Sequence, residues 1–399
     1  MEQERKPRIA ITHGDTNGVG YEVIFKAFED PAMLELCTPV IYGAPKVAAY
    51  HAKAINIDPQ FVVINNASEA QDGRLNLLAV IEDEVKVDLG QSTPEAGDAA
   101  KKAIDRALAD YKEGLFDVLV TAPVSKNSIK GFNGHSNYIE RQLADGRQGL
   151  TILCNDDLRV ALVTNNVAIK DVAEAITKQK IVEKATIFHQ ALKRDMRISS
   201  PRIAVLALNP RCGEDGVLGD EETEIITPAV NELANKGIQV FGPYAADDFF
   251  GSGAYYHFDG VLAMYHDQGQ TPFKALAPEN GVRYTAGLNI VRTAPAHGVC
   301  YSAAGRNQTD AGSLRCAIYT AIDVMRNRQN YDEPLQNPLP KLYHEKRDDS
   351  EKVRFRSPEN RPPFATKDRE QDGSDHDHES SPKEHAPKGK PIEPTPEAE

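Results

Sequence analysis

The sequence predicts an α/β domain with a largely parallel sheet. Short apolar runs rich in β-formers alternate with helical patterns of period 3.6 over residues 1–344. Polar loops follow the apolar runs, and two helical patterns end at a glycine, Gly114 and Gly237, as helices commonly do. With 399 residues and 40% apolar side chains, the chain can form one large or two medium globular domains.

Five apolar runs are expected to form strands, and two stretches between them are expected to form helices. The strand runs are residues 8–12, 117–122, 158–164, 202–208 and 260–265. One helix carries an apolar stripe from Ala100 to Tyr111 with i, i+3, i+4 spacing, and the second covers residues 221–236. Residues 345–399 are rich in proline and charge and poor in apolar side chains, so we expect a disordered tail after the folded residues 1–344.

Composition argues against several classes of protein. The chain carries 46 basic and 59 acidic residues, a net charge of −13, and has no basic stripe interleaved with aromatic residues, so nucleic acid is not an expected partner. Its five cysteines are widely spaced and form no CxxC pair, which argues against a disulfide framework or a zinc ribbon. No apolar run reaches the roughly 18 residues that a membrane-spanning helix needs, and the charged N-terminus is unlike a signal peptide. We therefore expect a cytoplasmic protein.

Polar residues follow four of the expected strands. They occupy residues 121–126, 164–166, 209–214 and 265–269. In an open parallel sheet, ligands bind outside the carboxyl ends of the strands, so these loops together predict the rim of an active site. The first strand leads into a glycine-rich turn, residues 13–20, whose spacing matches neither the dinucleotide-binding nor the phosphate-loop pattern. A phosphate near the following helix N-terminus is still compatible with the sequence.

Cationic and hydroxyl side chains gather in the second half of the chain and near residue 135. His135 and Ser136 follow a glycine, and Lys274, Arg283 and Arg292 come from one stretch. Such groups hold phosphates and carboxylates, which predicts an anionic substrate. A further histidine, His297, stands beside Gly298 in a loop that could lie against a planar base.

Taken in order, these segments resemble the PdxA family, the 4-hydroxythreonine-4-phosphate dehydrogenases of vitamin B6 synthesis. The resemblance covers roughly residues 8 to 330, and the run from Ala263 to Gly269 is its most specific part. The other matching segments are residues 14–20, 121–126, 134–136, 159–164, 208–210, 242–247 and 287–293.

The resemblance implies a fold similar to isocitrate and isopropylmalate dehydrogenases, with two α/β subdomains, an active site in the cleft between them, and a homodimer whose partner completes each site. It also implies NAD-dependent oxidation of 4-phosphooxy-L-threonine, or of a related phosphorylated hydroxy acid. Decarboxylation then gives 3-amino-2-oxopropyl phosphate. In the family a divalent metal, Zn, Mg, Mn or Co, is bound by three histidines and acidifies the alcohol.

The resemblance assigns roles to individual residues. Lys126 and Asp267 are assigned to catalysis, and His266 is assigned both to catalysis and to the metal. Substrate contacts are expected from His135, Ser136, Lys274 and Arg292, and from Arg283, which replaces an asparagine of the family. On the cofactor side we expect Asp247, His297 and Gly298.

The sequence departs from the family at the metal. The other two histidine positions are Asn166 and Arg211. An asparagine amide is a poor ligand for zinc-like cations, and a guanidinium cannot coordinate a metal at all. One hypothesis keeps the dehydrogenase reaction and gives Arg211 part of the metal's catalytic role. The alternatives are a site rebuilt from Cys212 and His266, an activity like that of phosphate acyltransferases, and a catalytically impaired homologue that binds a phosphorylated ligand.

Overall fold

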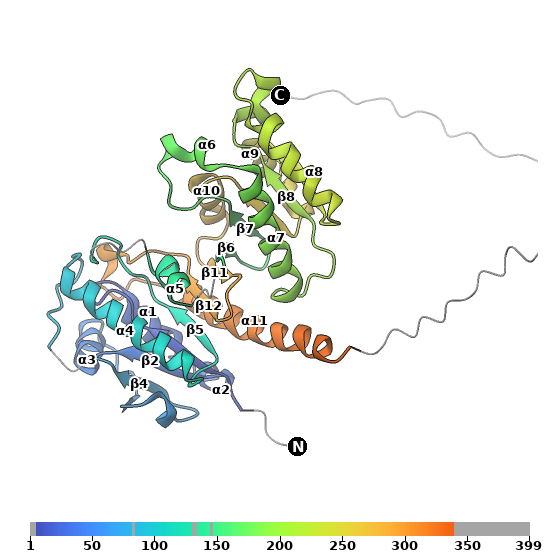
Figure 1. Cartoon of the computed structure of the whole chain (residues 1–399). Coiled ribbons are helices and arrows are strands. Elements are labelled where there is room, and N and C mark those ends of the chain that lie inside the picture. Colours follow the sequence, from blue (N-terminus) through green and yellow to red (C-terminus); the bar gives the residue numbers. More distant parts are fainter. Residues whose placement is uncertain (1–4, 82–83, 130–133, 144–146, 339–399) are drawn as a thin grey trace, which may run out of the picture. The chain divides into compact units, whose positions relative to one another are not determined.

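The structure is a computed structural model that describes residues 5–81, 84–129, 134–143 and 147–338. The tail expected over residues 345–399 lies outside the described residues. All described residues belong to one unit that ends at Pro338. Figure 1 shows its helices and strands coloured along the sequence.

The described residues form one sheet of twelve strands, in the order β3-β4-β2-β1-β5-β12-β11-β6-β7-β10-β8-β9. The pairings β12–β11, β11–β6 and β6–β7 are antiparallel, and the others are parallel. The largely parallel sheet predicted from sequence is thus confirmed, with an antiparallel centre that joins two parallel halves. The strands are β1 (Arg8–Thr12), β2 (Thr38–Gly43), β3 (Phe61–Ile64), β4 (Leu75–Ala79), β5 (Val118–Thr121), β6 (Leu150–Cys154), β7 (Arg159–Leu162), β8 (Ile203–Leu206), β9 (Val240–Tyr244), β10 (Gly260–Ala263), β11 (Val282–Ala286) and β12 (Val291–Pro295).

All five strand runs expected from sequence form strands, and four of these strands are two or three residues shorter than the expected run. The helices of the described residues are α1 (Gly20–Ala27), α2 (Ala32–Leu36), α3 (Pro45–Ala54), α4 (Pro94–Lys112), α5 (His135–Leu143), α6 (Val172–Ala175), α7 (Lys178–Arg194), α8 (Thr227–Asn235), α9 (Ala246–Gly251), α10 (His266–Leu276) and α11 (Gly312–Gln336). The helix expected over residues 221–236 is divided into a π-helical turn, Glu222–Ile226, and α8. Pro228 lies at the start of α8 and has no N–H to donate, which interrupts the regular hydrogen-bond pattern at this point.

Successive side chains of β1 point to opposite faces of the sheet, and each face is covered by different helices. Ile9 and Ile11 point to the cluster that includes α1 and α11, whereas Ala10 packs with Tyr42 against the apolar stripe of α4. Helix α11 lies along β5, β11 and β12 (Figure 1). Helices therefore cover both faces, which explains why the strand runs are apolar throughout.

The second half is built in the same way. Helices α7 and α8 pack on one face of β8 and β10, and α9 and α10 pack on the other. Gly260 marks how closely α7 approaches, because a Cβ on this glycine would lie 2.4 Å from Phe188 Cζ.

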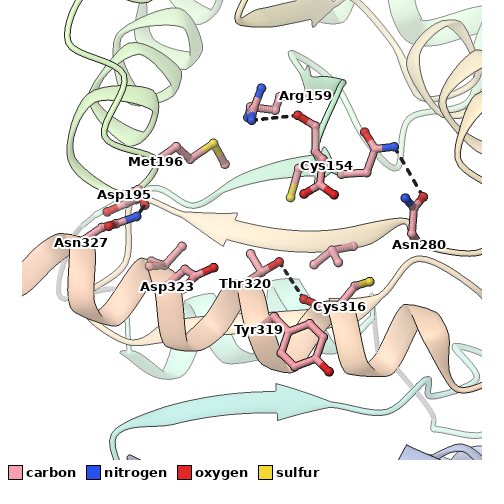
Figure 2. A pocket seen from close by; sticks show the side chains of 14 residues that line it. Cys154, Arg159, Asp195, Met196, Asn280, Cys316, Tyr319, Thr320, Asp323 and Asn327 are labelled. Carbon is pink, nitrogen blue, oxygen red and sulfur yellow. Dashed lines mark hydrogen bonds between the residues drawn. The ribbon is translucent and has the colours of Figure 1, made fainter. Parts of the chain in front are cut away.

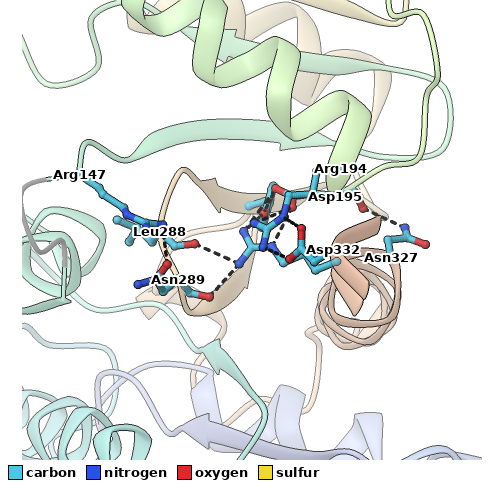
Figure 3. A network of polar contacts seen from close by, with 9 residues as sticks. Arg147, Arg194, Asp195, Leu288, Asn289, Asn327 and Asp332 are labelled. Atoms are coloured by element: carbon cyan, nitrogen blue, oxygen red, sulfur yellow. Dashed lines mark hydrogen bonds and ion pairs between the residues drawn. The ribbon is translucent and has the colours of Figure 1, made fainter. Parts of the chain in front are cut away.

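A buried ion-pair network ties α7 to α11 and to β11 (Figure 3). Asp195, at the end of α7, accepts hydrogen bonds from Arg328 Nε at 2.7 Å and from the Tyr284 hydroxyl at 2.5 Å. Arg328 also donates to the carbonyl oxygens of Leu288 and Asn289, in the turn between β11 and β12. The network therefore fixes the strand pair that carries Arg283 and Arg292.

Beside this network, a cavity of about 270 Å³ lies between α11 and the β6–β7 hairpin (Figure 2). Cys154 and Cys316 line it, and burial raises the pKa of both thiols. All five cysteines of the chain are free, in agreement with the absence of a disulfide framework expected from their spacing. No helix of the described residues is long and apolar enough to cross a membrane.

Candidate active site

A cavity of about 200 Å³ collects loops from both halves of the sheet. The segment after β5 contributes Lys126, the start of α5 contributes His135 and Ser136, and the loop after β7 contributes Asn165 and Asn166. The remaining walls come from His266, from Arg283, and from the end of β12 with the loop after it, which contribute Pro295, His297, Gly298 and Val299. Three of the four polar strand ends predicted from sequence therefore meet here, and the fourth, residues 209–214, does not line this cavity.

Arg292 lies directly behind this cavity and is fully buried. Its guanidinium is held by hydroxyl groups: it donates to Thr121 Oγ1, to Ser136 Oγ at 2.9 Å and to Thr285 Oγ1 at 3.1 Å. Among the described residues no carboxylate pairs with it. Burial, together with the charge of Arg283, lowers the pKa of Arg292. A buried guanidinium without a carboxylate partner is strongly stabilised by a bound anion.

The register of β11 and β12 places Arg283 beside Arg292. Thr285 stands opposite Arg292 and Arg283 stands opposite Ala294, so these four residues share one face of the strand pair. The intervening Tyr284 belongs to the other face and reaches Asp195. Arg283 donates a hydrogen bond of 3.3 Å to Gln270 Oε1, and burial lowers its pKa.

Burial and the charge of Arg283 lower the pKa of three further basic side chains. Burial, and then the charges of Arg292, Arg283 and Lys126, lower the pKa of His135 well below its usual value. Burial and Arg283 also lower the pKa of Lys126 and of Lys274. No aspartate or glutamate lines the cavity among the described residues. The site therefore concentrates positive charge, as expected for a substrate with more than one anionic group.

The expected metal position is occupied by other interactions. Lys126 Nζ donates a hydrogen bond of 2.7 Å to Asn166 Oδ1, and His266 Nδ1 lies 2.6 Å from Asp267 Oδ1. Arg211, with its side chain 75% exposed, pairs with Glu214 at 2.7 Å and does not line the cavity. The described residues contain no group of three His, Cys, Asp or Glu side chains that could hold a metal ion. These residues do not fit the divalent metal that the resemblance implies.

This geometry gives no support to the hypothesis that Arg211 substitutes for the metal. Residues 211–215 all have positive φ, and the loop turns the Arg211 side chain toward solvent. Cys212 Sγ lies 3.6 Å from the Pro243 carbonyl oxygen, and Cys212 does not line the cavity that His266 lines. Burial raises the pKa of its thiol. A site rebuilt from Cys212 and His266 therefore has no geometric basis in this structure.

Of the residues expected to contact the cofactor, His297 and Gly298 line the cavity. His297 Nδ1 is 2.8 Å from the Gly298 carbonyl oxygen, which makes Nδ1 the donor and leaves Nε2 as a buried acceptor without a protein partner among the described residues. Burial lowers the pKa of His297. Asp247 lies in the first turn of α9 and is not part of the cavity wall.

The glycine-rich turn, residues 13–20, is buried throughout and packs the site from behind. A Cβ at Gly18 would lie 2.3 Å from Val299 Cγ1, and the Val19 N–H donates to the Val299 carbonyl oxygen. The turn therefore supports the loop after β12.

Sequence reasoning missed the role of Asp15 in this turn. Its buried carboxylate accepts hydrogen bonds at Oδ2 from the Tyr301 hydroxyl at 2.8 Å and from Ser128 Oγ at 3.1 Å. It thus joins the loop after β5 to the loop after β12. Only its position directly after a strand could have indicated this role, and nothing in the sequence marks Ser128 or Tyr301.

A family model described as pyridoxal phosphate biosynthetic protein PdxA matches residues 35–321. The 4-hydroxythreonine-4-phosphate dehydrogenase of Bacteroides thetaiotaomicron is 56% identical over 357 residues, which cover 88% of this chain and 98% of that protein. The chain belongs to the PdxA family. A second PdxA relative, the enzyme of the same name from Geobacter metallireducens, is 37% identical and covers 80% of this chain and 96% of its own length.

Solved structures extend the similarity to the fold of PdxA proteins. The 4-hydroxythreonine-4-phosphate dehydrogenase from Klebsiella pneumoniae superposes with a TM-score of 0.68 at 28% identity, over 80% of this chain and 100% of that one. The enzyme of the same name from Burkholderia phymatum gives 0.64 at 32% identity, over 80% and 99%. The resemblance inferred from sequence motifs is thereby confirmed, together with the α/β fold.

Proposed function

We propose that this PdxA protein oxidises 4-phosphooxy-L-threonine, or a related phosphorylated hydroxy acid, with NAD, and that decarboxylation yields 3-amino-2-oxopropyl phosphate for pyridoxal phosphate biosynthesis. The observation that carries the proposal is the fully buried Arg292, surrounded by hydroxyls and lacking a carboxylate partner among the described residues. The names of the relatives support the reaction.

Different cationic residues suit the different anionic groups of the substrate. Arg292 and Ser136 suit the phosphate, since a guanidinium and a hydroxyl both donate to phosphate oxygens. Arg283 and Lys126, which line the same cavity, suit the carboxylate and the reacting oxygen. Two anionic groups on one substrate match the excess of positive charge better than a phosphate alone.

His266 suits the proton transfer of alcohol oxidation. Its Nδ1 lies 2.6 Å from Asp267, so an Nδ1–H donor leaves Nε2 as the acceptor for the hydroxyl proton. NAD, when bound, accepts the hydride, and His297, Gly298 and Asp247 are the residues proposed to contact it. The family suggests a cytoplasmic location and a homodimer. Light scattering would measure the molar mass and so distinguish a dimer from a monomer.

NADH absorbance tests the proposal. We expect turnover with 4-phosphooxy-L-threonine and none with 4-hydroxy-L-threonine, which lacks the phosphate and serves as the matched control. Equal rates with both compounds would contradict the role of Arg292. Calorimetric binding of the phosphorylated compound without turnover would instead favour a binding role for the protein.

A further inference from the structure

The three positions at which a PdxA metal is expected are engaged in bonds to other protein groups. The oxygen of Asn166, its one ligand atom suited to a cation, accepts a hydrogen bond from Lys126 at 2.7 Å. His266 and Asp267 pair with each other through Nδ1 and Oδ1, and Arg211 pairs with Glu214 in solvent. A metal ion would have to displace the ammonium group of Lys126 before it could reach Asn166.

The charge of the site also opposes a dication. Lys126 and Arg283 line the cavity, Arg292 lies behind it, and the described residues place no carboxylate in its wall. Bound divalent metals in proteins are normally surrounded by anionic or neutral ligands in sufficient number to offset their charge. Here every added positive charge is repelled by those already present.

Lys126 brings a positive charge to Asn166, one of the positions at which the family's metal ligands are expected. Its Nζ reaches across the cavity from the segment after β5 to the loop after β7, and both Asn166 and His266 line the same wall. An ammonium has three N–H donors, and the hydrogen bond to Asn166 uses one of them. Among the described residues Lys126 Nζ makes no second hydrogen bond, so its other two N–H groups are available to a ligand.

We propose that Lys126, oriented by Asn166, takes the place of the divalent cation and that this protein works without a metal. The ammonium donates to the substrate's alcohol oxygen, and it stabilises the negative charge that develops on this oxygen as the proton and the hydride leave and the oxygen becomes that of the ketone. Asn166 acts as a positioning residue for Lys126. The inference rests on the proposed dehydrogenase function only for its kinetic test, since metal affinity is measured without turnover.

The first experiment measures metal on the full-length protein, purified without a metal-affinity tag. Elemental analysis is expected to find far less than one Zn, Mg, Mn or Co per chain, and calorimetric titration with zinc alone is expected to show no binding at the site. The double variant Asn166→His with Arg211→His is the matched control for a restored ligand set. Near-stoichiometric metal in the wild type, or zinc affinity equal to that of the double variant, would overturn the proposal, whatever the activity.

The second experiment separates a catalytic lysine from a structural one. Lys126→Met is expected to lower kcat by roughly 100-fold or more with a smaller change in KM, as loss of an oxyanion-stabilising donor does. Lys126→Arg keeps the charge and is expected to recover part of kcat. Asn166→Ala is expected to lower kcat less than Lys126→Met does. Lys170→Met, an exposed lysine after the same loop, is the control and leaves kcat unchanged.

Chelation gives the final test. Activity of the wild type is expected to survive EDTA without loss, and added zinc is expected not to raise it. Inactivation by EDTA with recovery on adding metal would refute the proposal while leaving the dehydrogenase function intact. If the wild type shows no turnover at all, the dehydrogenase function fails, and metal analysis with zinc titration still decides whether the site takes a cation.

Discussion

Arg292 and Thr285 stand directly opposite one another on β12 and β11, and Arg292 Nη1 donates a 3.1 Å hydrogen bond to Thr285 Oγ1. The antiparallel register thus determines which side chains of this strand pair lie on the side of the cavity. A shift by one residue would bring Tyr284 and Thr293 to the cavity and turn both arginines toward α11. The binding of an anion therefore depends on contacts that hold this strand pair in place.

Arg292→Lys tests the anion site. Lysine keeps the positive charge but cannot bond several hydroxyls and a phosphate at once, so we expect KM for the phosphorylated substrate to rise by roughly 30-fold, about 2 kcal/mol. Steady-state kinetics and competition by inorganic phosphate measure this effect. Arg306→Lys, on an exposed segment, is the control. An unchanged KM would mean that Arg292 does not contact the substrate's phosphate.

Two buried histidines predict a pH-dependent stability. Burial, and then the charge of His51, lower the pKa of His13 to about 4, and burial also lowers the pKa of His51. His13 stacks on Tyr21 with ring centroids 5.2 Å apart. Because the unfolded chain binds these protons near pH 6.5 and the folded chain does not, stability is full above pH 6.5 and falls as the pH decreases toward 4.

For His13 alone the loss over this interval is about 3 kcal/mol. Urea unfolding at pH 7 and pH 4 measures the difference, and His13→Phe, which keeps the stacking and removes the titration, is expected to flatten the pH dependence. His257→Phe, at an exposed histidine, is the control. An equal slope in wild type and His13→Phe would assign the acid sensitivity to other groups.

Much of this fold follows from patterns that depend on near neighbours along the chain. Apolar runs bounded by polar loops located β1, β5 and β10, and the stripe of α4 was visible because its burial repeats every 3.6 residues. The antiparallel centre of the sheet was not predictable, since the pairing of β6 with β11 joins residues more than 120 positions apart. Nothing local encodes such a partner.

The candidate site shows the same division. Arg292 was found because a matching segment carried it, and Arg283 was noticed because it replaces an asparagine of the family. The loss of the metal ligands was visible at Asn166 and Arg211. The interaction of Lys126 with Asn166 was not, because it connects loops after two different strands. Sequence identified which residues were unusual, whereas only the fold showed what each one contacts.

Gly97→Ala tests the packing behind the site. A Cβ at this position in α4 would lie 2.3 Å from the Ser128 carbonyl oxygen, in the segment that also carries Lys126. Although alanine favours a helix by about 1 kcal/mol, we expect overpacking to lower the free energy of unfolding by roughly 1–3 kcal/mol and to raise KM. Gly251→Ala, where the added methyl meets nothing within 4 Å, is the control. A more stable Gly97→Ala protein would show that the Ser128 segment yields easily.

The network around Asp195 predicts that substitutions of two of its partners, Arg328 and Tyr284, lower the free energy of unfolding by different amounts (Figure 3). Arg328→Met leaves the Asp195 carboxylate buried without its cation, so we expect the free energy of unfolding to fall by about 3–5 kcal/mol. Tyr284→Phe removes one hydrogen bond to a charged acceptor, and we expect a loss of about 1.5–3 kcal/mol. Urea unfolding measures both, with Arg326→Met, exposed on the same helix, as the control. If Arg328→Met costs no more than Tyr284→Phe, the Asp195 carboxylate takes up a proton or reaches water when its cation is removed, and the ion pair is not what holds α11 against β11.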